Sequence, residues 1–344
     1  MHIPSIPSTR DAELAKRLQH AIDNKTKPLG SLGLLESLAH QIGLIQQRVD
    51  VEISDPAIMV FAGDHGVCDE GVSAFPQDVS WQMVENFLAN GAGINVFATQ
   101  TGCRLQVIDA GVKHDFGDRP GLINRKVAWG TANFAKQAAM TIEQCEQALQ
   151  HGIDLARELP GNIVGFGEMG IGNTTPASAL LHKYTGVPVA NCVGAGAGLS
   201  SEGIRRKQEV IERAVALHGE MHDPLQILAT FGGLEIAMMA GAMLQSAAMR
   251  KILLIDGFIT SSALLAAARI QPNILDYCIF AHASDEAGHK HMLSNLGARP
   301  VLHLSLRLGE GTGSALALPI VQAAVNFLRN MATFESAEVS TQSA

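Results

Sequence analysis

The sequence has little of several features that mark specialised classes of protein. It contains five cysteines in 344 residues, an odd number, and no two have the C-x-x-C spacing of a zinc or redox site. Aromatic residues make up 5% and charged residues 17%, whereas glycine is plentiful at 34 residues. We therefore expect free thiols in a reducing compartment, and helices packed closely on a sheet rather than an all-β sandwich.

The sequence also shows no apolar run of membrane-spanning length, no signal-peptide pattern in its first residues and no cluster of basic residues. Arg250 and Asp256 interrupt the longest apolar run before it reaches spanning length, and residues 1–4 lack the pattern of a signal peptide. The formal net charge is −8, with lysines and arginines scattered along the chain. A nucleic-acid partner requires a basic face. We expect a cytoplasmic protein with no membrane span and no nucleic-acid partner.

The pattern of apolar residues predicts an α/β fold. Short continuous apolar runs, each followed by a Gly-rich turn and a helical stretch, indicate strands buried on both faces of a parallel sheet. The expected strands are 58–62, 105–108, 163–166, 187–193, 252–255 and 278–281. The expected helices are 8–22, opened by Ser8, then 34–48, 77–88, 141–157, 205–217, 233–248, 259–269 and 314–329. This alternation predicts a doubly wound, mainly parallel sheet flanked by helices.

The length predicts one large domain and a smaller one. Residues 1–55 have a purely helical pattern, and residues 56–305 carry the strand–helix alternation. The stretch 306–331 contains a glycine-rich turn and the last helix, and 332–344 is a polar tail that we expect to fray.

Polar residues follow several of the expected strands. In open parallel sheets ligands bind beyond the carboxyl ends of the strands, so these residues are expected to converge on one cleft. They are Asp64-His65, Asp109, Glu168, Asp256 and the stretch 282–284.

The turn at 165–175 is the strongest local indication of a phosphate ligand. Its glycines precede a helix N-terminus, where backbone N–H groups and the positive end of the helix attract an anion. It lacks the lysine of a Walker A loop, and its third glycine falls one residue short of a dinucleotide-binding motif. Plain turn chemistry is the alternative interpretation of such glycines.

Two acids are candidates for proton transfer. Glu310 is flanked by glycines between the apolar stretch 306–308 and a helix start, and Glu168 occupies a similar turn. Half-buried between apolar walls, such a carboxyl would have a raised pKa and could act as a general base. We expect no metal site, because His289 and His291 lie in an expected helix and point apart.

Seven segments together resemble the nicotinate-nucleotide–dimethylbenzimidazole phosphoribosyltransferases. The matching stretches run in the expected order from residue 25 to about 320. They are 27–33 (KPLGSLG), 61–67 (FAGDHGV), 71–77 (GVSAFPQ), 167–175 (GEMGIGNTT), 256–259 (DGFI), 282–289 and 306–313 (LRLGEGTG).

The resemblance implies a function and a set of residues. Nicotinate mononucleotide and 5,6-dimethylbenzimidazole, or a related base, would give α-ribazole 5′-phosphate and nicotinate in cobalamin biosynthesis, with no cofactor. It implies a homodimer and a small helical domain made of both chain ends. Glu310 matches the catalytic base and Glu168 the second active-site acid. The base pocket would include Ser73, Gln82 and Met169, with Leu306 and Leu308 as an apolar slot. Phosphate and ribose would contact Gly170, Asn173, Thr174, Lys207, Ser284 and Arg307, and Gly309 and Gly311, on either side of Glu310, would also bind substrate.

Three alternatives stay open at this point. One is a transferase that uses another aromatic base, such as a different benzimidazole, a purine or a phenol. Another is a metal-dependent phosphoesterase built on Asp64, His65 and His282. The third is a nucleotide-binding sensor without turnover, against which the two acids argue because a sensor needs no base.

Overall fold

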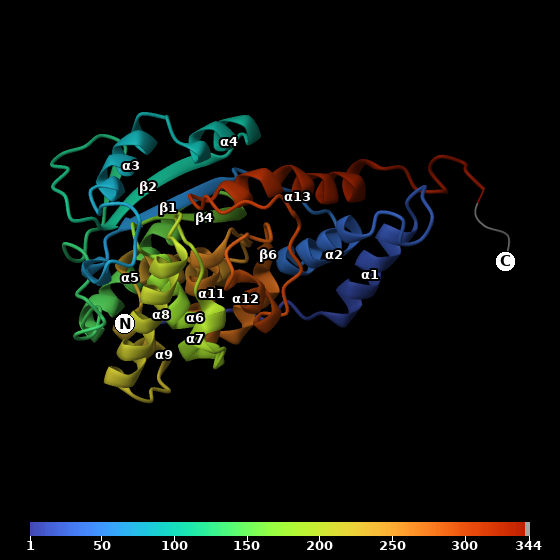
Figure 1. The fold of residues 1–344 in the computed structure, drawn as a ribbon. Coiled ribbons are helices and arrows are strands. Elements are labelled where there is room, and N and C mark those ends of the chain that lie inside the picture. Colours follow the sequence, from blue (N-terminus) through green and yellow to red (C-terminus); the bar gives the residue numbers. More distant parts are fainter. Residues whose placement is uncertain (341–344) are drawn as a thin grey trace.

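The computed structural model describes residues 1–340 and has a six-stranded parallel sheet at its centre (Figure 1). Across the sheet the order is β3-β2-β1-β4-β5-β6. The chain therefore builds outward from β1 on one side and then crosses to the other side for β4. The α/β class and the parallel sheet flanked by helices are as predicted. The strands are β1 (Ala57–Gly63), β2 (Arg104–Gly111), β3 (Leu122–Asn124), β4 (Ile163–Met169), β5 (Ile252–Ile255) and β6 (Cys278–Phe280).

Helices cover both faces of the sheet (Figure 1). One face carries α10 (Leu234–Ala248) and α11 (Phe258–Ile270). The other carries α3 (Val79–Leu88), α4 (Gly93–Thr101) and the first part of α13 (Thr312–Asn330). The remaining helices are α1 (Ala12–Asp23), α2 (Leu34–Gln46), α5 (Ile142–Glu158), α6 (Thr174–Thr185), α7 (Val189–Cys192), α8 (Ser201–His218), α9 (Pro224–Phe231) and α12 (His289–Asn295), with 3-10 turns at Gly66–Glu70 and Pro272–Tyr277.

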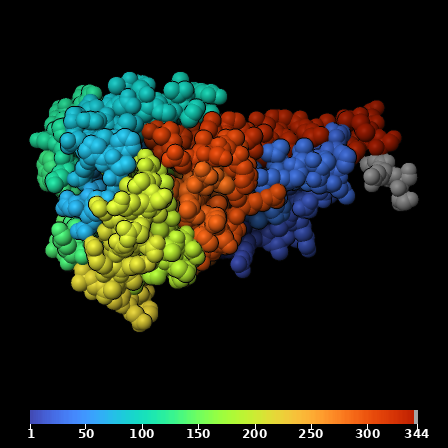
Figure 2. Space-filling view, viewed as in Figure 1, coloured from blue at the N-terminus to red at the C-terminus, as the bar shows by residue number. Residues whose placement is uncertain are grey.

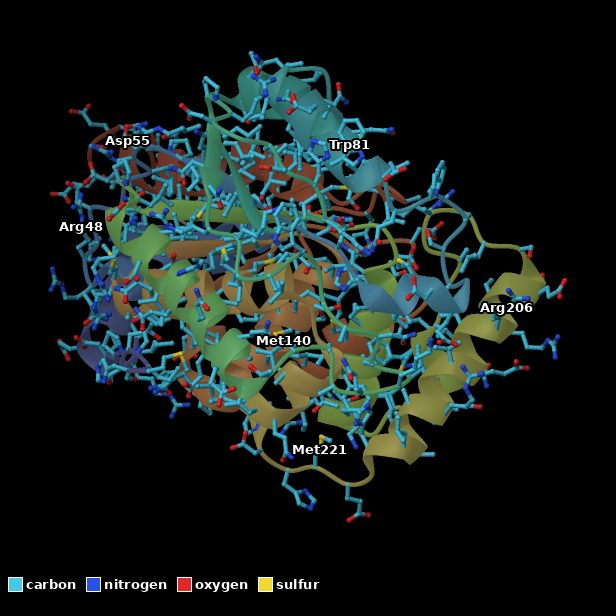
Figure 3. All side chains as sticks on the ribbon, turned by 90° about the vertical axis from the view of Figure 1, so that its left-hand side faces the viewer. Arg48, Asp55, Trp81, Met140, Arg206 and Met221 are labelled. Atoms are coloured by element: carbon cyan, nitrogen blue, oxygen red, sulfur yellow. The ribbon has the colours of Figure 1, made fainter. Side chains whose placement is uncertain are left out.

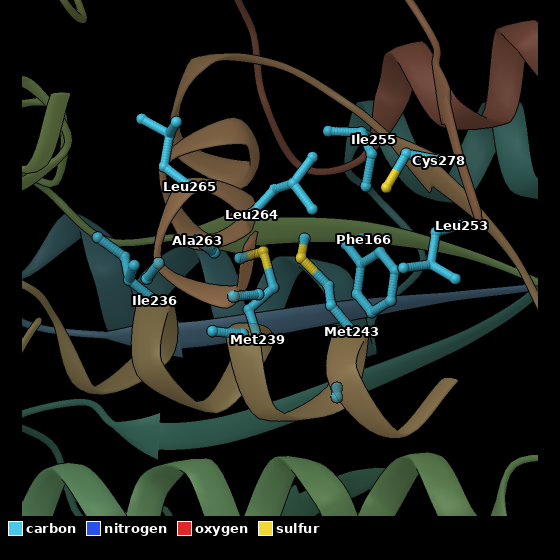
Figure 4. Packing of buried hydrophobic residues seen from close by; sticks show 14 of the residues in the cluster. Phe166, Ile236, Met239, Met243, Leu253, Ile255, Ala263, Leu264, Leu265 and Cys278 are labelled. Carbon is cyan, nitrogen blue, oxygen red and sulfur yellow. The ribbon is translucent and has the colours of Figure 1, made fainter. Parts of the chain in front are cut away.

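Burial on both faces explains the continuous apolar runs. All of β1 is buried; Met59 joins the core under α10 and α11, whereas its neighbour Val60 joins the core under α3 and α4. On the first face, Met239 and Met243 of α10 lie toward Phe166 of β4 (Figure 4). Helix α10 is apolar all round because α5 packs on its outer side. Among the described residues no helix is both long enough and apolar enough to cross a membrane.

Two details of the predicted elements are wrong. The apolar run 187–193 is not a strand: Pro188 caps the short helix α7, and an apolar run of this length does not by itself distinguish a strand from a buried helical turn. The first helix begins at Ala12 rather than Ser8, because Asp11 is the N-cap and accepts the N–H groups of Glu13 and Leu14. In addition, β3, α4 and α9 are elements that the sequence pattern did not predict.

Helices α1 and α2 lie beside the last part of α13 at the narrow end of the molecule, whereas the N-terminus itself is at the broad end (Figures 1 and 2). Helix α2 packs against α13, and the Lys25 ammonium donates to the carbonyl of Met331 at 2.8 Å. Lys25 also forms an antiparallel bridge with Thr333, at the start of the stretch expected to fray; residues 341–344 lie outside the described residues. From these contacts we propose that 1–55 and the end of 306–331 form a small domain beside the 56–305 domain.

Candidate active site

A cavity opens where the chain reverses its direction of winding, at the carboxyl ends of β1 and β4. This is the place where open α/β sheets bind ligands. Figure 3 views the molecule from the side where α3 and α8 lie, with Trp81 and Arg206 labelled on them. The cavity is lined by the turn after β4, the loops after β5 and β6, and three further segments: 72–74, 195–199 and 307–309.

Glu168, near the end of β4, is one of the acids in the wall of this cavity, together with Asp256 and Glu286. Burial, reinforced by the nearby Asp256 and Glu235 carboxyls, raises the pKa of Glu168 to about 8. The side-chain amide of Asn173 donates to Glu168 Oε2, and this hydrogen bond acts in the opposite direction. At neutral pH Glu168 is therefore mainly protonated and able to donate a hydrogen bond.

The turn after β4 leads directly into α6, and a lysine from α8 reaches it. The Lys207 ammonium is buried and donates to Thr174 Oγ1 at 2.7 Å, in the first turn of α6. Burial lowers the pKa of Lys207 to about 8, against the attraction of Glu286. A cation beside a helix N-terminus is a suitable arrangement for binding an anion.

Gly170 in this turn must be glycine for a reason internal to the protein. A Cβ at this position would lie 2.4 Å from the carbonyl oxygen of Gly63, at the end of β1. The turn therefore packs directly on the neighbouring strand. A larger residue here would displace the backbone of the site before it touched any ligand.

Two loops complete the cavity on the side of β5 and β6. Arg307 is exposed and donates to the carbonyl of Gly196 at 3.2 Å. This hydrogen bond joins the 307–309 segment to the loop 194–198, which consists of glycine and alanine. The backbone N–H of Ser284 donates to His289 Nδ1 at 2.9 Å, and His289 Nε2 lies 3.2 Å from Ser261 Oγ. Burial lowers the pKa of His289 to about 3, so its ring is neutral. Because Nδ1 accepts the Ser284 N–H, the hydrogen of the neutral ring is on Nε2.

The 309–311 turn lies directly on β4 and carries Glu310. All three residues are left-handed, with φ of 82°, 63° and 89°, and for Glu310 this conformation is uncommon. A Cβ at Gly167 would lie 2.2 Å from the carbonyl oxygen of Glu310, so β4 must present a glycine there. A Cβ at Gly309 would lie equally close, 2.2 Å, to Glu168 Oε1. The turn thus brings Glu310 next to Glu168 by close backbone approach.

The Glu310 carboxylate contacts the first turn of α4. It is 3% exposed, and its Oε2 accepts the backbone N–H of Ile94 at 3.1 Å. Burial raises the pKa of Glu310, and the hydrogen bond from Ile94 opposes that rise. A backbone donor thus favours the ionised form of each acid: the N–H of Ile94 for Glu310, and the N–H of Glu310 for Glu168.

Most of the predicted site residues meet in the cavity. Gln82 does not, because it is exposed on α3, and Glu310 and Gly311 lie behind the lining rather than in it. Leu306 also lies outside the lining, whereas Leu308 belongs to it. The predicted residues that line the cavity are Ser73, Glu168, Met169, Gly170, Asn173, Thr174, Lys207, Ser284, Arg307, Leu308 and Gly309.

Sequence reasoning left Asp256 and His282 outside the site-residue set, although both line the cavity. Asp256 Oδ1 accepts the N–H of Ser314 at 3.0 Å, in the first turn of α13, and lies 3.7 Å from His282 Nε2. Burial raises the pKa of Asp256 to about 7. Their positions after a strand placed both residues in the expected cleft, although the family resemblance gave neither of them a role. The 194–198 loop, which consists of glycine and alanine, also lines the cavity with Ala195, Gly196 and Ala197.

The residues of the phosphoesterase alternative do not converge. His282 lines the cavity, but Asp64 and His65 do not, and His65 Nε2 contacts the Glu235 carboxylate at 2.8 Å. Within the described part of the chain, no group of three or more His, Cys, Asp or Glu side chains is arranged to hold a metal ion.

The fold and the cavity define an α/β enzyme, and comparisons with known proteins identify its class. A family model described as "Phosphoribosyltransferase" matches residues 8–339. The chain belongs to the nicotinate-nucleotide–dimethylbenzimidazole phosphoribosyltransferases, the family that its motifs resemble.

Relatives of that name cover the whole chain. One from Janthinobacterium sp. (strain Marseille) is 63% identical over 343 residues, 99% of each chain. One from Dechloromonas aromatica (strain RCB) is 58% identical and covers 98% of this chain and 97% of its own. A crystal structure of CobT from Thermus thermophilus has a TM-score of 0.93 and 43% identity, covering 96% of this chain and all of the other.

Proposed function

We propose that this chain transfers the phosphoribosyl group of nicotinate mononucleotide to 5,6-dimethylbenzimidazole, with Glu310 as the general base. The products are α-ribazole 5′-phosphate and nicotinate, a step in assembling the nucleotide loop of cobalamin. The observation that carries the assignment of the base is the 309–311 turn. It places a buried carboxylate with a backbone donor beside a second acid, Glu168, whose pKa is raised to about 8.

The mononucleotide is assigned to the side of the cavity formed by α6 and α8. Lys207 and the first turn of α6 supply positive charge and N–H groups for its phosphate. Asn173 and Thr174 border the same turn, Ser284 and Arg307 face it from the loops opposite, and Gly170 lets the turn approach closely. These groups are suited to a phosphate and a ribose, which present oxygens to hydrogen-bond donors.

The aromatic base is assigned to the opposite side, near Glu310. Ser73, Met169 and Leu308 line the cavity there, and the two apolar side chains can flank a flat bicyclic ring. Gln82 is exposed on α3, so it would reach the aromatic base only from the rim of the cavity. Because Gly309 and Gly311 have no side chains, the aromatic base can approach the backbone of the 309–311 turn closely.

The proton balance of this reaction assigns different roles to the two acids. The unprotonated ring nitrogen of the benzimidazole attacks C1′ as the bond from C1′ to the pyridinium nitrogen breaks. Nicotinate leaves as a neutral pyridine, and the electron pair of the broken bond stays on its nitrogen. The N–H proton of the alkylated benzimidazole passes to Glu310. Glu168, protonated at neutral pH, cannot accept it and instead donates a hydrogen bond.

Two further properties are proposed on the strength of family membership. We expect a homodimer, and we expect the enzyme to work in the cytoplasm, where five unpaired thiols are compatible with a reducing environment.

One assay tests the function: release of nicotinate from its mononucleotide, measured with and without added dimethylbenzimidazole. Release that depends on the base supports the transferase. Release without it would indicate a hydrolase, and binding without release would indicate a sensor. Competition between dimethylbenzimidazole, other benzimidazoles, purines and phenols would identify the preferred base.

A further inference from the structure

Helix α4 begins without a capping side chain of its own. Its N-cap is Ala92, and alanine is a poor residue at this position because it cannot accept the free N–H groups of the first turn. The helix start is nevertheless well fixed: Asn95 Oδ1 accepts the N–H of Ala92 at 3.1 Å, and the Asn95 amide donates to the carbonyl of Phe87 in α3 at 3.0 Å.

The missing acceptor comes from a residue 216 positions away in the chain. The N–H of Ile94, the second residue of the helix, donates to Glu310 Oε2 at 3.1 Å in a buried contact. Glu310 is therefore the cap of α4, and the first turn of α4 holds the carboxylate.

Gly93, the first residue of α4, gives the room for this contact. A Cβ at this position would lie 2.9 Å from Leu308 Cδ2 and 3.4 Å from Glu310 Oε2. Leu308 in turn lines the cavity and is 57% exposed, and both its side chain and the Glu310 carboxylate border the position that a Cβ on residue 93 would occupy. Residue 93 thus lies behind the apolar wall of the proposed base pocket.

We propose that the first turn of α4 is the positioning element of Glu310: the Ile94 N–H orients the carboxylate, and the absence of a side chain at Gly93 sets the room beside it. The inference rests on the proposed role of Glu310 as the base. Gly93 touches no reacting atom in this scheme and acts through Glu310 and Leu308.

Other charged groups near Glu310 lie on the far side of the turn. They are Glu168 at the end of β4 and Asp256 after β5; the residues of α4 and the first turn of α13 are uncharged. A disturbance at Gly93 therefore reaches Glu310 before it reaches any other titratable group. Displacing the Ile94 donor removes the interaction that opposes the raised pKa of Glu310.

The test is Gly93→Ala. The extra methyl group meets the flexible end of an exposed leucine, and alanine is the better helix former, so the variant is expected to fold with at least normal stability. We expect turnover to fall by roughly 10- to 100-fold, the scale of a base displaced by a fraction of an ångström to 1 Å. The acidic limb of the pH profile of kcat should move to higher pH. Affinity for nicotinate mononucleotide should stay unchanged.

Specificity gives a second measurement in the same variant. If the methyl group pushes Leu308 toward the cavity, KM should rise more for 5,6-dimethylbenzimidazole than for unsubstituted benzimidazole. Thr99→Ala, an exposed substitution on the same helix, is the matched control and should change neither the pH profile nor the ratio of KM values.

Glu310→Gln separates the failure of this inference from that of the proposed function. Gln can still accept the Ile94 N–H, so the cap is kept while the base is lost. If Glu310→Gln turns over normally, Glu310 is only a helix cap and the proposed base is wrong. If Glu310→Gln is nearly inactive but Gly93→Ala has a normal pH profile, normal turnover and a normal KM ratio, the base stands and the positioning role of α4 is overturned. In single-turnover experiments, Gly93→Ala should add little to the defect of Glu310→Gln.

Discussion

The imidazole Nε2 of His65 and Oε1 of Glu235 lie 2.8 Å apart, and neither side chain is exposed to solvent. His65 follows β1, and Glu235 is in the first turn of α10, so the contact joins the central strand to the helix that covers it. The pair lies directly beneath the turn of the active site, since a Cβ on Gly170 would be 3.1 Å from His65 Nε2. Burial alone would lower the pKa of His65, but the nearby carboxyls, Glu235 first and then Asp64 and Glu168, together outweigh burial, and the net pKa is raised.

We expect His65→Gln to destabilise the protein by about 3–5 kcal/mol, because it leaves the Glu235 carboxylate buried without its charged partner. The double variant His65→Gln, Glu235→Gln should recover most of that loss, since two amides can pair without charge. Urea unfolding of the three proteins at pH 6 measures both effects. Equal stability of the single and double variants would show that the two side chains are not coupled.

The pH dependence of this pair has a definite sign. A group whose folded pKa is raised contributes stability that is fully present below its unfolded pKa, about 6.5 for histidine. That contribution is lost as the pH rises through the folded pKa. The stability advantage of the wild type over the double variant should therefore decrease as the pH is raised from 6 to 9. An advantage that grows with pH would contradict the raised pKa of His65.

The sheet was predictable because burial on both faces imposes continuous apolar runs, but α4 was not. Helix starts are recognised by a Ser, Thr, Asp or Asn cap, and α4 has Ala92 there. Its acceptor, Glu310, comes from a distant part of the chain. In the same way, the run 187–193 did not reveal that Pro188 begins a helical turn. Sequence periodicity reports local order, whereas both features depend on tertiary contacts.

The site residues likewise include some that local sequence could predict and others that depend on tertiary contacts. The polar residues after β4, β5 and β6 reach one cavity, as the rule for parallel sheets predicts. Asp64 and His65 follow β1 equally closely, yet they turn under the cavity toward Lys113 and Glu235. The orientation of Glu310 was also beyond sequence reasoning, because the left-handed turn that aims it depends on the lack of a side chain at Gly167.

Lys207 should make binding of nicotinate mononucleotide dependent on pH. Its pKa is lowered to about 8, so the ammonium is charged at pH 7 and largely neutral at pH 9. We expect the dissociation constant to increase several-fold over this range. Lys207→Met should weaken binding roughly 10- to 100-fold, equivalent to ~1.5–3 kcal/mol for a hydrogen bond to a charged group. It should also reduce the dependence on pH, leaving only the part due to Glu168, whose pKa is also about 8.

Arg205→Met is the control for that measurement, since Arg205 is exposed on the same helix and pairs with Glu209. It should leave both the affinity and its dependence on pH unchanged. Calorimetry between pH 7 and 9 gives the dissociation constants. If Lys207→Met binds as tightly as the wild type, the phosphate is held elsewhere in the cavity.

Catalysis should survive treatment with a chelator. The leaving nitrogen of nicotinate carries a positive charge before departure, so no metal is needed to neutralise a leaving pyrophosphate. We expect the rate of nicotinate release to be unchanged after incubation with EDTA and removal of the chelator–metal complex. Loss of activity that a divalent ion restores would contradict this chemistry.

Glu310→Gln is the variant that tests the proton acceptor. Loss of a general base slows turnover by roughly 10²- to 10⁴-fold. Affinity for the mononucleotide should change little, because Lys207 and the turn after β4 lie on the other side of the cavity. Stability should also be kept, since the Gln oxygen can still accept the Ile94 N–H. Single-turnover kinetics, both dissociation constants and urea unfolding measure these quantities separately.

Glu310→Ala completes the argument, because it removes the base and the cap of α4 together. It should be as slow as Glu310→Gln in turnover, but less stable by about 0.5–2 kcal/mol, the usual cost of a lost N-cap acceptor. Equal stability of the two variants would mean that the Ile94 hydrogen bond does not cap α4. Near-normal turnover in both would make Glu310 a structural residue. Glu168 would not replace it as the base at neutral pH, because a carboxyl with a pKa of about 8 is protonated there.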